Sequence, residues 1–81
     1  MPSTDIEKSE INDGISLLDL MLKAELIPSK SEGRRLVKQG GVSVDDIKIT
    51  DVNKMITLED FNENEIIIKK GKKVYHKINI V

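Results

Sequence analysis

The sequence predicts an α+β fold in which two short, packed helices precede a small, mostly antiparallel sheet. Residues 16–26 are dense in apolar helix formers, and residues 29–40 form a second helical stretch with its own start and stop signals. After Gly41 the apolar residues recur at every second position, which is the period of a strand. Helices followed by strands, rather than alternating with them, favour separate helical and sheet regions.

Length and composition limit the possible functions. The chain has 81 residues, no cysteine and one histidine, so we expect a single small domain with no disulfide framework, no metal site and no cofactor. No apolar run approaches the roughly 20 residues that a membrane span requires. The N-terminus is acidic, which is unlike a signal peptide. We therefore expect a cytoplasmic, monomeric domain without membrane contact.

Residues 1–14 are polar and acidic, and Ile6 and Ile11 are their only large aliphatic side chains besides Met1. We interpret this segment as a linker or flexible lead-in and place the folded domain at residues 15–81. In the first helix Ser16 is the expected N-cap, and Asp19 suits the positive end of the helix dipole.

The second helix begins with a capping box. Ser29 is followed three residues later by Glu32, and Pro28 disfavours helix for the residue before it. Helical spacing places Gly33, Leu36, Val37 and Gly40 on one face, and the basic residues Lys30, Arg34, Arg35 and Lys38 on another. One face should therefore pack, while the other presents positive charge. Gly40 and Gly41 end the helix.

Two hairpins should follow. Residues 42–44 and 47–49 alternate around Asp45-Asp46, with Val42, Val44, Ile47 and Ile49 expected to face inward. Asp-Asp is a weaker turn signal than Asp-Gly. Residues 50–64 predict a loop that holds either a short strand or a helical turn near residues 57–60. Residues 65–70 and 73–81 form the second hairpin around Gly71-Lys72.

Charge is segregated along the chain although the net charge is −1. Residues 30–44 carry four basic residues against one acidic residue, and residues 69–81 carry five lysines and no acid. Residues 45–68 carry two lysines against seven acids. Such segregation allows a strongly positive surface on a nearly neutral protein, although interspersed surface charge is the simpler alternative.

Catalysis by this domain alone is not expected, because the sequence offers no cysteine nucleophile, no phosphate-binding glycine motif and no paired carboxylates beside an apolar pocket. Binding of a polyanion is better supported, since Arg and Lys on the second helix suit phosphate oxygens. The lysines of the last hairpin add a second basic region, and two rings beside them allow limited base stacking. The candidate contacts are Lys30, Ser31, Arg34, Arg35, Lys38, Lys69, Lys70, Lys72, Lys73, Tyr75 and His76. Neutralisation of the arginines by Glu32, and Tyr75 as an ordinary half-buried strand residue, are the alternatives.

The stretch from Ile27 to Val44, IPSKSEGRRLVKQGGVSV, resembles the α-L RNA-binding motif of the family named after the fourth small-subunit ribosomal protein. Together with IIIKKGKKVYHKI at residues 66–78, it is more narrowly similar to the C-terminal domains of bacterial tyrosyl-tRNA synthetases. The resemblance covers the chain from about Leu17 to the C-terminus and implies a non-catalytic RNA-binding domain. Its implied partners are tRNA-Tyr, bound at the variable arm and anticodon stem region, and the catalytic domain of the same synthetase.

The resemblance adds Gln39 to the RNA-facing residues. This chain departs from the family pattern at two places, since the family commonly has Ala at Gly33 and Asn-Gly at Asp45-Asp46. Glycine should weaken the helix by roughly 0.5–1 kcal/mol. Two alternatives stay open: the same RNA-binding module in a pseudouridine synthase or ribosome-associated heat-shock protein, and a protein-interaction module that docks a basic partner on its acidic loop 45–65.

Overall fold

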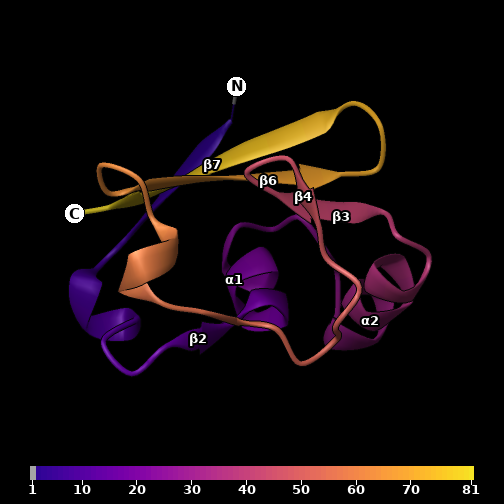
Figure 1. Ribbon diagram of the computed structural model, residues 1–81, viewed down its shortest axis with the longest axis horizontal. Coiled ribbons are helices and arrows are strands. Elements are labelled where there is room, and N and C mark those ends of the chain that lie inside the picture. Colours follow the sequence, from indigo (N-terminus) through magenta and orange to yellow (C-terminus); the bar gives the residue numbers. More distant parts are fainter. Residues whose placement is uncertain (1) are drawn as a thin grey trace.

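The computed structural model describes residues 2–81, which form a five-stranded sheet with two helices against one of its faces (Figure 1). The bounds in chain order are β1 Ser3–Ile6, η1 Lys8–Glu10, β2 Ile15–Ser16, α1 Leu17–Lys23, α2 Lys30–Lys38, β3 Val42–Val44, β4 Ile47–Lys48, β5 Met55–Ile56, η2 Leu58–Asp60, β6 Glu65–Lys70 and β7 Val74–Ile80. The elements η1 and η2 are single turns of 3-10 helix. The predicted α+β class is confirmed. No helix within residues 2–81 has the length and apolar character to cross a membrane.

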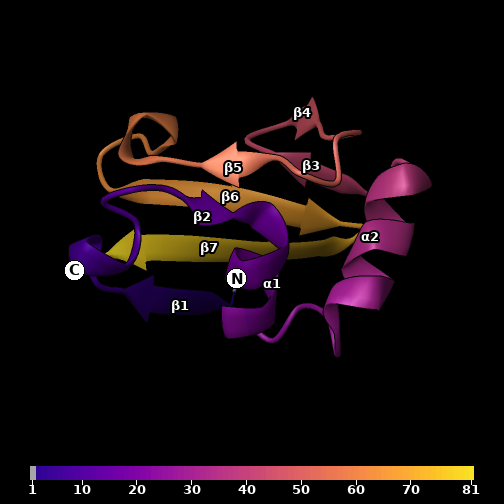
Figure 2. The same cartoon turned by 90° about the horizontal axis from the view of Figure 1, so that it is seen from below.

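The main sheet has the strand order β1-β7-β6-β3-β4, and β2 pairs with β5 in a separate ribbon (Figure 2). Only the β1–β7 pair of the main sheet is parallel. The face of the main sheet that points toward the helices contributes five residues to the core: Val42, Val44, Ile66, Ile68 and Ile78. Leu17, Leu20 and Met21 of α1 are buried in the same core. Side-chain alternation places Glu65, Ile67, Lys69, Tyr75 and Lys77 on the opposite face of this sheet.

The N-terminal segment is a structural part of the domain, so the prediction of a linker or lead-in at residues 1–14 is wrong for the part that the structure describes. Strand β1 pairs with β7 in register Ser3 to Lys77 through Ile6 to Ile80. The side chains of Ile6 and Ile11 are buried in the core. The partner strand lies at the other end of the chain, so the local sequence pattern cannot predict this pairing. Residue 1 lies outside the described residues.

Both helices begin at the serines that the sequence indicated. The Ser16 hydroxyl accepts a hydrogen bond from the Asp19 backbone N–H at 3.1 Å, and Ser29 accepts one from Glu32 at 3.3 Å. These caps satisfy N–H groups that have no partner within the helix. The reciprocal half of the predicted capping box is absent from the described hydrogen bonds, because the Glu32 carboxylate instead accepts from Arg35 at 2.7 Å.

Gly33 allows α1 and α2 to approach closely. A Cβ at this position would lie 2.6 Å from Ile27 Cδ1 and 2.7 Å from Leu18 Cδ2, distances too short for real carbon contacts. Both neighbours are buried, so their side chains have little room to move. The glycine that weakens the helix as an isolated element therefore has a packing role between the two helices.

The β3–β4 hairpin forms as predicted, but Ile47 is not buried. Asp45 and Asp46 have φ values of 48° and 68°, which suit the two-residue turn that joins twisted strands. Ile47 stands opposite Val44 in the register, yet its side chain is 68% exposed. The reason is that β4 is the edge strand of the sheet. Within residues 2–81 no further strand pairs with its outer edge.

Residues 50–64 contain both of the alternatives that the sequence left open. Strand β5 pairs with β2 in register Ile56 to Ile15, and η2 follows directly. The turn of η2 is capped by Asp60, whose carboxylate accepts the Thr57 backbone N–H at 2.8 Å. The last hairpin, β6–β7, turns at Gly71 with φ of 68°, as its sequence predicted.

Candidate nucleic-acid interface

Helix α2 presents a basic depression to solvent. The helical period of 3.6 residues per turn places Ser31, Arg34, Arg35 and Lys38 on the side opposite the buried Gly33 and Val37. Together with Gln39 they line a shallow pocket of about 510 Å³. The structure therefore brings together five of the six residues predicted on this helix.

Two of the α2 cations already have local partners. The Lys30 ammonium lies 2.7 Å from the Asp19 carboxylate, an ion pair that holds the pKa of Asp19 below its ordinary value. Arg35 donates from one nitrogen to both oxygens of Glu32 at 2.7 Å. All four side chains remain substantially exposed, so these pairs contribute little to stability and can be exchanged for other partners.

Arg34 and Lys38 differ from the paired cations. Both are exposed, and neither forms an ion pair within residues 2–81. They lie four residues apart on α2, so their side chains project in the same direction. The alternative of a neutralised helix face thus applies to Arg35 and leaves Arg34 and Lys38 as unneutralised positive charge.

The lysine-rich turn of the last hairpin lies at the same end of the molecule as the end of α2 (Figure 2). The Gly71 backbone N–H donates to the Gly41 carbonyl at 2.6 Å, which ties the β6–β7 turn to the residues that follow the helix. Lys72 and Lys73 occupy this turn and are exposed. The geometry therefore joins two regions of positive charge that are about thirty residues apart in sequence.

Lys70 does not belong to this exposed group, which corrects its predicted role. It follows Ile66 and Ile68 on the inward face of β6, and its ammonium donates to the Leu26 carbonyl at 2.7 Å. That carbonyl lies in the connection between α1 and α2, where the helical hydrogen-bond ladder has ended. Lys70 therefore links the sheet to the helix pair.

Lys69 and Tyr75 stand opposite each other on the outer face of the sheet. The Lys69 ammonium lies 5.4 Å from the centroid of the Tyr75 ring, within the range of a cation–π contact. The Tyr75 side chain is 39% exposed, so it is neither enclosed in the core nor fully free. Both residues stay candidates for contact with a ligand on this face.

His76 is corrected as well, because its ring points inward and is only 8% exposed. Its Nε2 atom lies 2.7 Å from the Thr4 hydroxyl, so the ring forms a hydrogen bond to strand β1. Burial lowers the pKa of His76, which favours the neutral imidazole. A ring held in this way has no face available for stacking against a base.

Lys48 is a basic residue that the sequence reading missed. It stands opposite Ser43 on β3, which in turn stands opposite Lys69 on β6. The Lys48 side chain lies along Gly40 at the end of α2, where an added Cβ would be 2.9 Å from its ammonium. Strand alternation around the Asp45-Asp46 turn could have placed it on the same sheet face as Ser43.

No group of three or more His, Asp or Glu side chains within residues 2–81 is arranged to hold a metal ion. The chemistry that the α2 depression and the β6–β7 turn support is recognition of negative charge by guanidinium and ammonium groups.

Comparison with known proteins decides the family. Residues 1–78 match the family described as tyrosine--tRNA ligase SYY-like C-terminal domain. The chain belongs to this family. The match confirms the resemblance found in the α2 and β6–β7 sequences. It also includes the N-terminal segment, in which the structure pairs residues 3–6 with strand β7.

Curated relatives of this C-terminal domain family are ligases. The chain is 51% identical over all 81 residues to a tyrosine--tRNA ligase of Acetivibrio thermocellus, of which it covers 20%. It is 48% identical over 80 residues to one of Clostridium beijerinckii and 49% identical over 78 residues to one of Clostridium botulinum, covering 19% of each. The chain thus spans about a fifth of the length of the relatives it matches.

Proposed function

We propose that this domain is the RNA-binding appendage of a tyrosine--tRNA ligase and docks tRNA-Tyr in support of aminoacylation by a catalytic domain of the same protein. The domain itself carries no catalytic role in this proposal. Membership of the C-terminal domain family and the names of the relatives support the partner. The observation that carries the proposal is the α2 depression, where Arg34 and Lys38 are exposed and unneutralised in the described structure.

The mechanism is electrostatic docking on a surface of matching shape. Arg34 and Arg35 offer planar guanidinium groups to phosphate oxygens, while Lys38 and the hairpin lysines supply mobile positive charge. Ser31 and Gln39 add uncharged polar groups to the same depression. Contacts of this kind position a folded RNA without reading its bases, and the variable arm and anticodon stem region of tRNA-Tyr is the proposed target.

The ion pairs Arg35–Glu32 and Lys30–Asp19 orient two of the basic side chains in this mechanism. Each pair holds its basic side chain in a defined position before RNA arrives. A phosphate with several negative oxygens can then compete for the cation, because both pairs are solvent-exposed and weak.

A salt titration of binding tests this function. A tRNA-Tyr transcript is titrated with the 81-residue protein at several salt concentrations, with a tRNA of short variable arm as the comparison. If roughly three to six phosphates are neutralised, the logarithm of the affinity should fall linearly with the logarithm of salt, with a slope of about −2 to −5. A flat salt dependence would contradict the docking mechanism, and equal affinity for the two RNAs would contradict the proposed target.

A further inference from the structure

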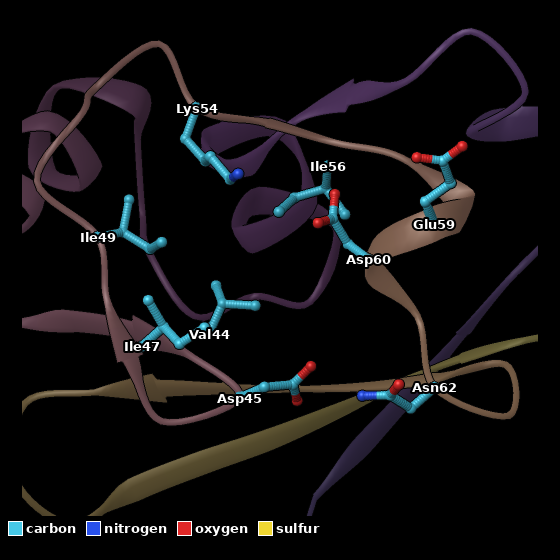
Figure 3. Close-up of a pocket in the computed structure, with 9 residues that line it drawn as sticks. All are labelled: Val44, Asp45, Ile47, Ile49, Lys54, Ile56, Glu59, Asp60 and Asn62. Carbon is cyan, nitrogen blue, oxygen red and sulfur yellow. The ribbon is translucent and has the colours of Figure 1, made fainter.

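The acidic side of the molecule contains a pocket that RNA docking does not use. It has a volume of about 410 Å³ and lies between the β3–β4 hairpin, strand β5 and the turn η2 (Figure 3). Its apolar part is formed by Val44, Ile47, Ile49 and Ile56. None of these residues belongs to α2 or to the β6–β7 turn, so the pocket and the basic depression are separate surfaces.

Ile47 is the feature that points to a partner. Its side chain is 68% exposed, whereas its neighbours in the pocket, Ile49 and Ile56, are buried. The exposed aliphatic group therefore continues the surface of the hydrophobic core out to solvent. Apolar surface that is contiguous with a concave pocket is typical of an interaction site, whereas a single isolated apolar residue is not.

The charged residues that line the pocket indicate that a binding partner would be positively charged. Asp45, Glu59 and Asp60 contribute three carboxylates against the one ammonium of Lys54. Within residues 2–81, none of these four groups forms an ion pair. Residues 45–68 as a whole carry seven acids against two lysines, so the surrounding field is negative as well.

Two of the carboxylates are fixed in position. Asp45 accepts the Ile67 backbone N–H at 3.0 Å, and Asp60 accepts the Thr57 backbone N–H at 2.8 Å. They come from different elements around the pocket, Asp60 from η2 and Asp45 from the β3–β4 turn (Figure 3). Each still has an oxygen free to accept another hydrogen bond. A cationic side chain entering the pocket would therefore meet prearranged acceptors next to an apolar surface.

We propose that this pocket docks a protein segment that carries a large aliphatic side chain next to a lysine or arginine. The volume lies at the low end of the range of about 300–1,000 Å³ for ligand pockets, which fits one aliphatic anchor and an adjacent basic side chain. RNA is disfavoured as the occupant because the carboxylates repel phosphate. Peptide binding in this pocket and tRNA docking on α2 involve different residues and opposite charges. An experiment can therefore contradict one proposal without contradicting the other.

The test is an NMR titration of the isotope-labelled protein with a defined peptide. The probe is a blocked pentapeptide with leucine at its centre, flanked by lysine and arginine, with serine at both ends. We expect saturable shifts of the methyl signals of Ile47, Ile49 and Ile56. A matched peptide with serine in place of leucine should bind about tenfold more weakly or worse, because the apolar anchor is lost. A peptide with glutamates in place of the basic residues should produce no shifts.

Two protein variants complete the experiment. Ile47→Ser removes the exposed anchor surface, and Glu59→Lys reverses an exposed charge that has no hydrogen bond within the described residues. Each should weaken the leucine peptide at least about fivefold while leaving tRNA-Tyr affinity within about twofold. Thermal unfolding reports whether each variant is folded, and Glu59→Lys serves as the second variant if Ile47→Ser is not.

Three results would overturn the proposal. The leucine and serine peptides could shift the pocket signals equally, which would reduce the effect to charge attraction. The shifts could be absent or lie outside the pocket. Alternatively, a tRNA-Tyr transcript could shift the signals of Ile47 and Ile56, which would assign the pocket to RNA. Loss of tRNA binding with intact peptide binding would instead contradict only the proposed function.

Discussion

The Asp45 carboxylate accepts a hydrogen bond from the backbone N–H of Ile67 at 3.0 Å, and the Asp45 N–H donates to the Ile67 carbonyl at 2.9 Å. The first residue of the β3–β4 turn is thereby joined to the middle of strand β6. Asp45 also has a positive φ of 48°, a conformation that Asp and Asn tolerate better than most residues. A turn that looked weak by its local sequence is therefore stabilised by a contact 22 residues away.

This contact predicts a difference between two substitutions of Asp45. Asp45→Asn keeps an oxygen acceptor and tolerates the positive φ, so we expect the free energy of unfolding to change by less than about 0.5 kcal/mol. Asp45→Ala leaves the Ile67 N–H without this partner, and we expect a loss of about 1–3 kcal/mol. Urea unfolding of both variants measures the difference. Equal stability of the two would contradict a structural role for this hydrogen bond.

The buried His76 predicts that acidification lowers stability. Its pKa is below the ordinary value of 6.5 in the folded chain, so the unfolded chain binds a proton more readily. The stabilising contribution is therefore complete above about pH 6.5 and is lost as the pH falls from there toward the lowered folded pKa. The thermal unfolding midpoint should fall between pH 7.5 and pH 5.5.

The control for this prediction is His76→Gln, which keeps a polar group near Thr4 but does not titrate. Its midpoint should change less than that of the natural protein over the same pH interval. The carboxylates of Glu10 and Asp19, whose pKa values are lowered by Lys23 and Lys30, lose their contribution only below about pH 4.5, outside this interval. A variant that retains the full pH slope would show that His76 is not its source.

At Gly33, an alanine would have two opposing effects on stability, one on helix propensity and one on packing. Alanine would favour the isolated helix by about 0.5–1 kcal/mol, but its Cβ would overlap Ile27 and Leu18, and overpacking of this kind costs about 1–3 kcal/mol. We therefore expect Gly33→Ala to lower the free energy of unfolding by about 1 kcal/mol. In an Ile27→Val background, which removes the Cδ1 atom at 2.6 Å, the same substitution should be less harmful. An increase in stability in the natural background would show that propensity dominates.

The lysines around the last turn should separate into two classes. Lys72→Ala combined with Lys73→Ala removes exposed charge, so we expect weaker tRNA-Tyr binding by about threefold or more with unchanged stability. Lys70→Ala removes the donor to the Leu26 carbonyl, so we expect a loss of about 1 kcal/mol in stability. Filter binding and urea unfolding on both proteins test this. A stability loss in the double variant, or none in Lys70→Ala, would contradict the assignment.

Local signals predicted much of this fold correctly. The serine caps of α1 and α2, the change of period after Gly41 and the turn at Gly71 each depend on neighbouring residues, and the structure confirms them. Most residues of the α2 depression were predictable for the same reason, because helical spacing alone determines which side chains share a face.

The errors have a different origin. The pairing of β1 with β7 joins the two ends of the chain, and the exposure of Ile47 depends on β4 being an edge strand. Neither the strand pairing nor the exposure of Ile47 can be predicted from neighbouring residues. His76 and Lys70 were misjudged although alternation carried the information, since His76 shares a strand face with Ile78, and Lys70 shares one with Ile68. The strand face on which a basic residue lies, and not the number of basic residues nearby, determines whether its side chain is exposed.

Docking of tRNA on α2 should depend on Arg34 and Lys38, the two helix cations that form no ion pair within residues 2–81. The most direct measurement of this dependence is the tRNA-Tyr dissociation constant of Arg34→Ala combined with Lys38→Ala, compared with Lys8→Ala combined with Lys54→Ala. The second variant loses the same charge away from the helix and is the matched control. We predict binding weaker by about tenfold or more for the α2 variant and by less than about threefold for the control, with both proteins folded. Equal affinities for the two variants would contradict this dependence.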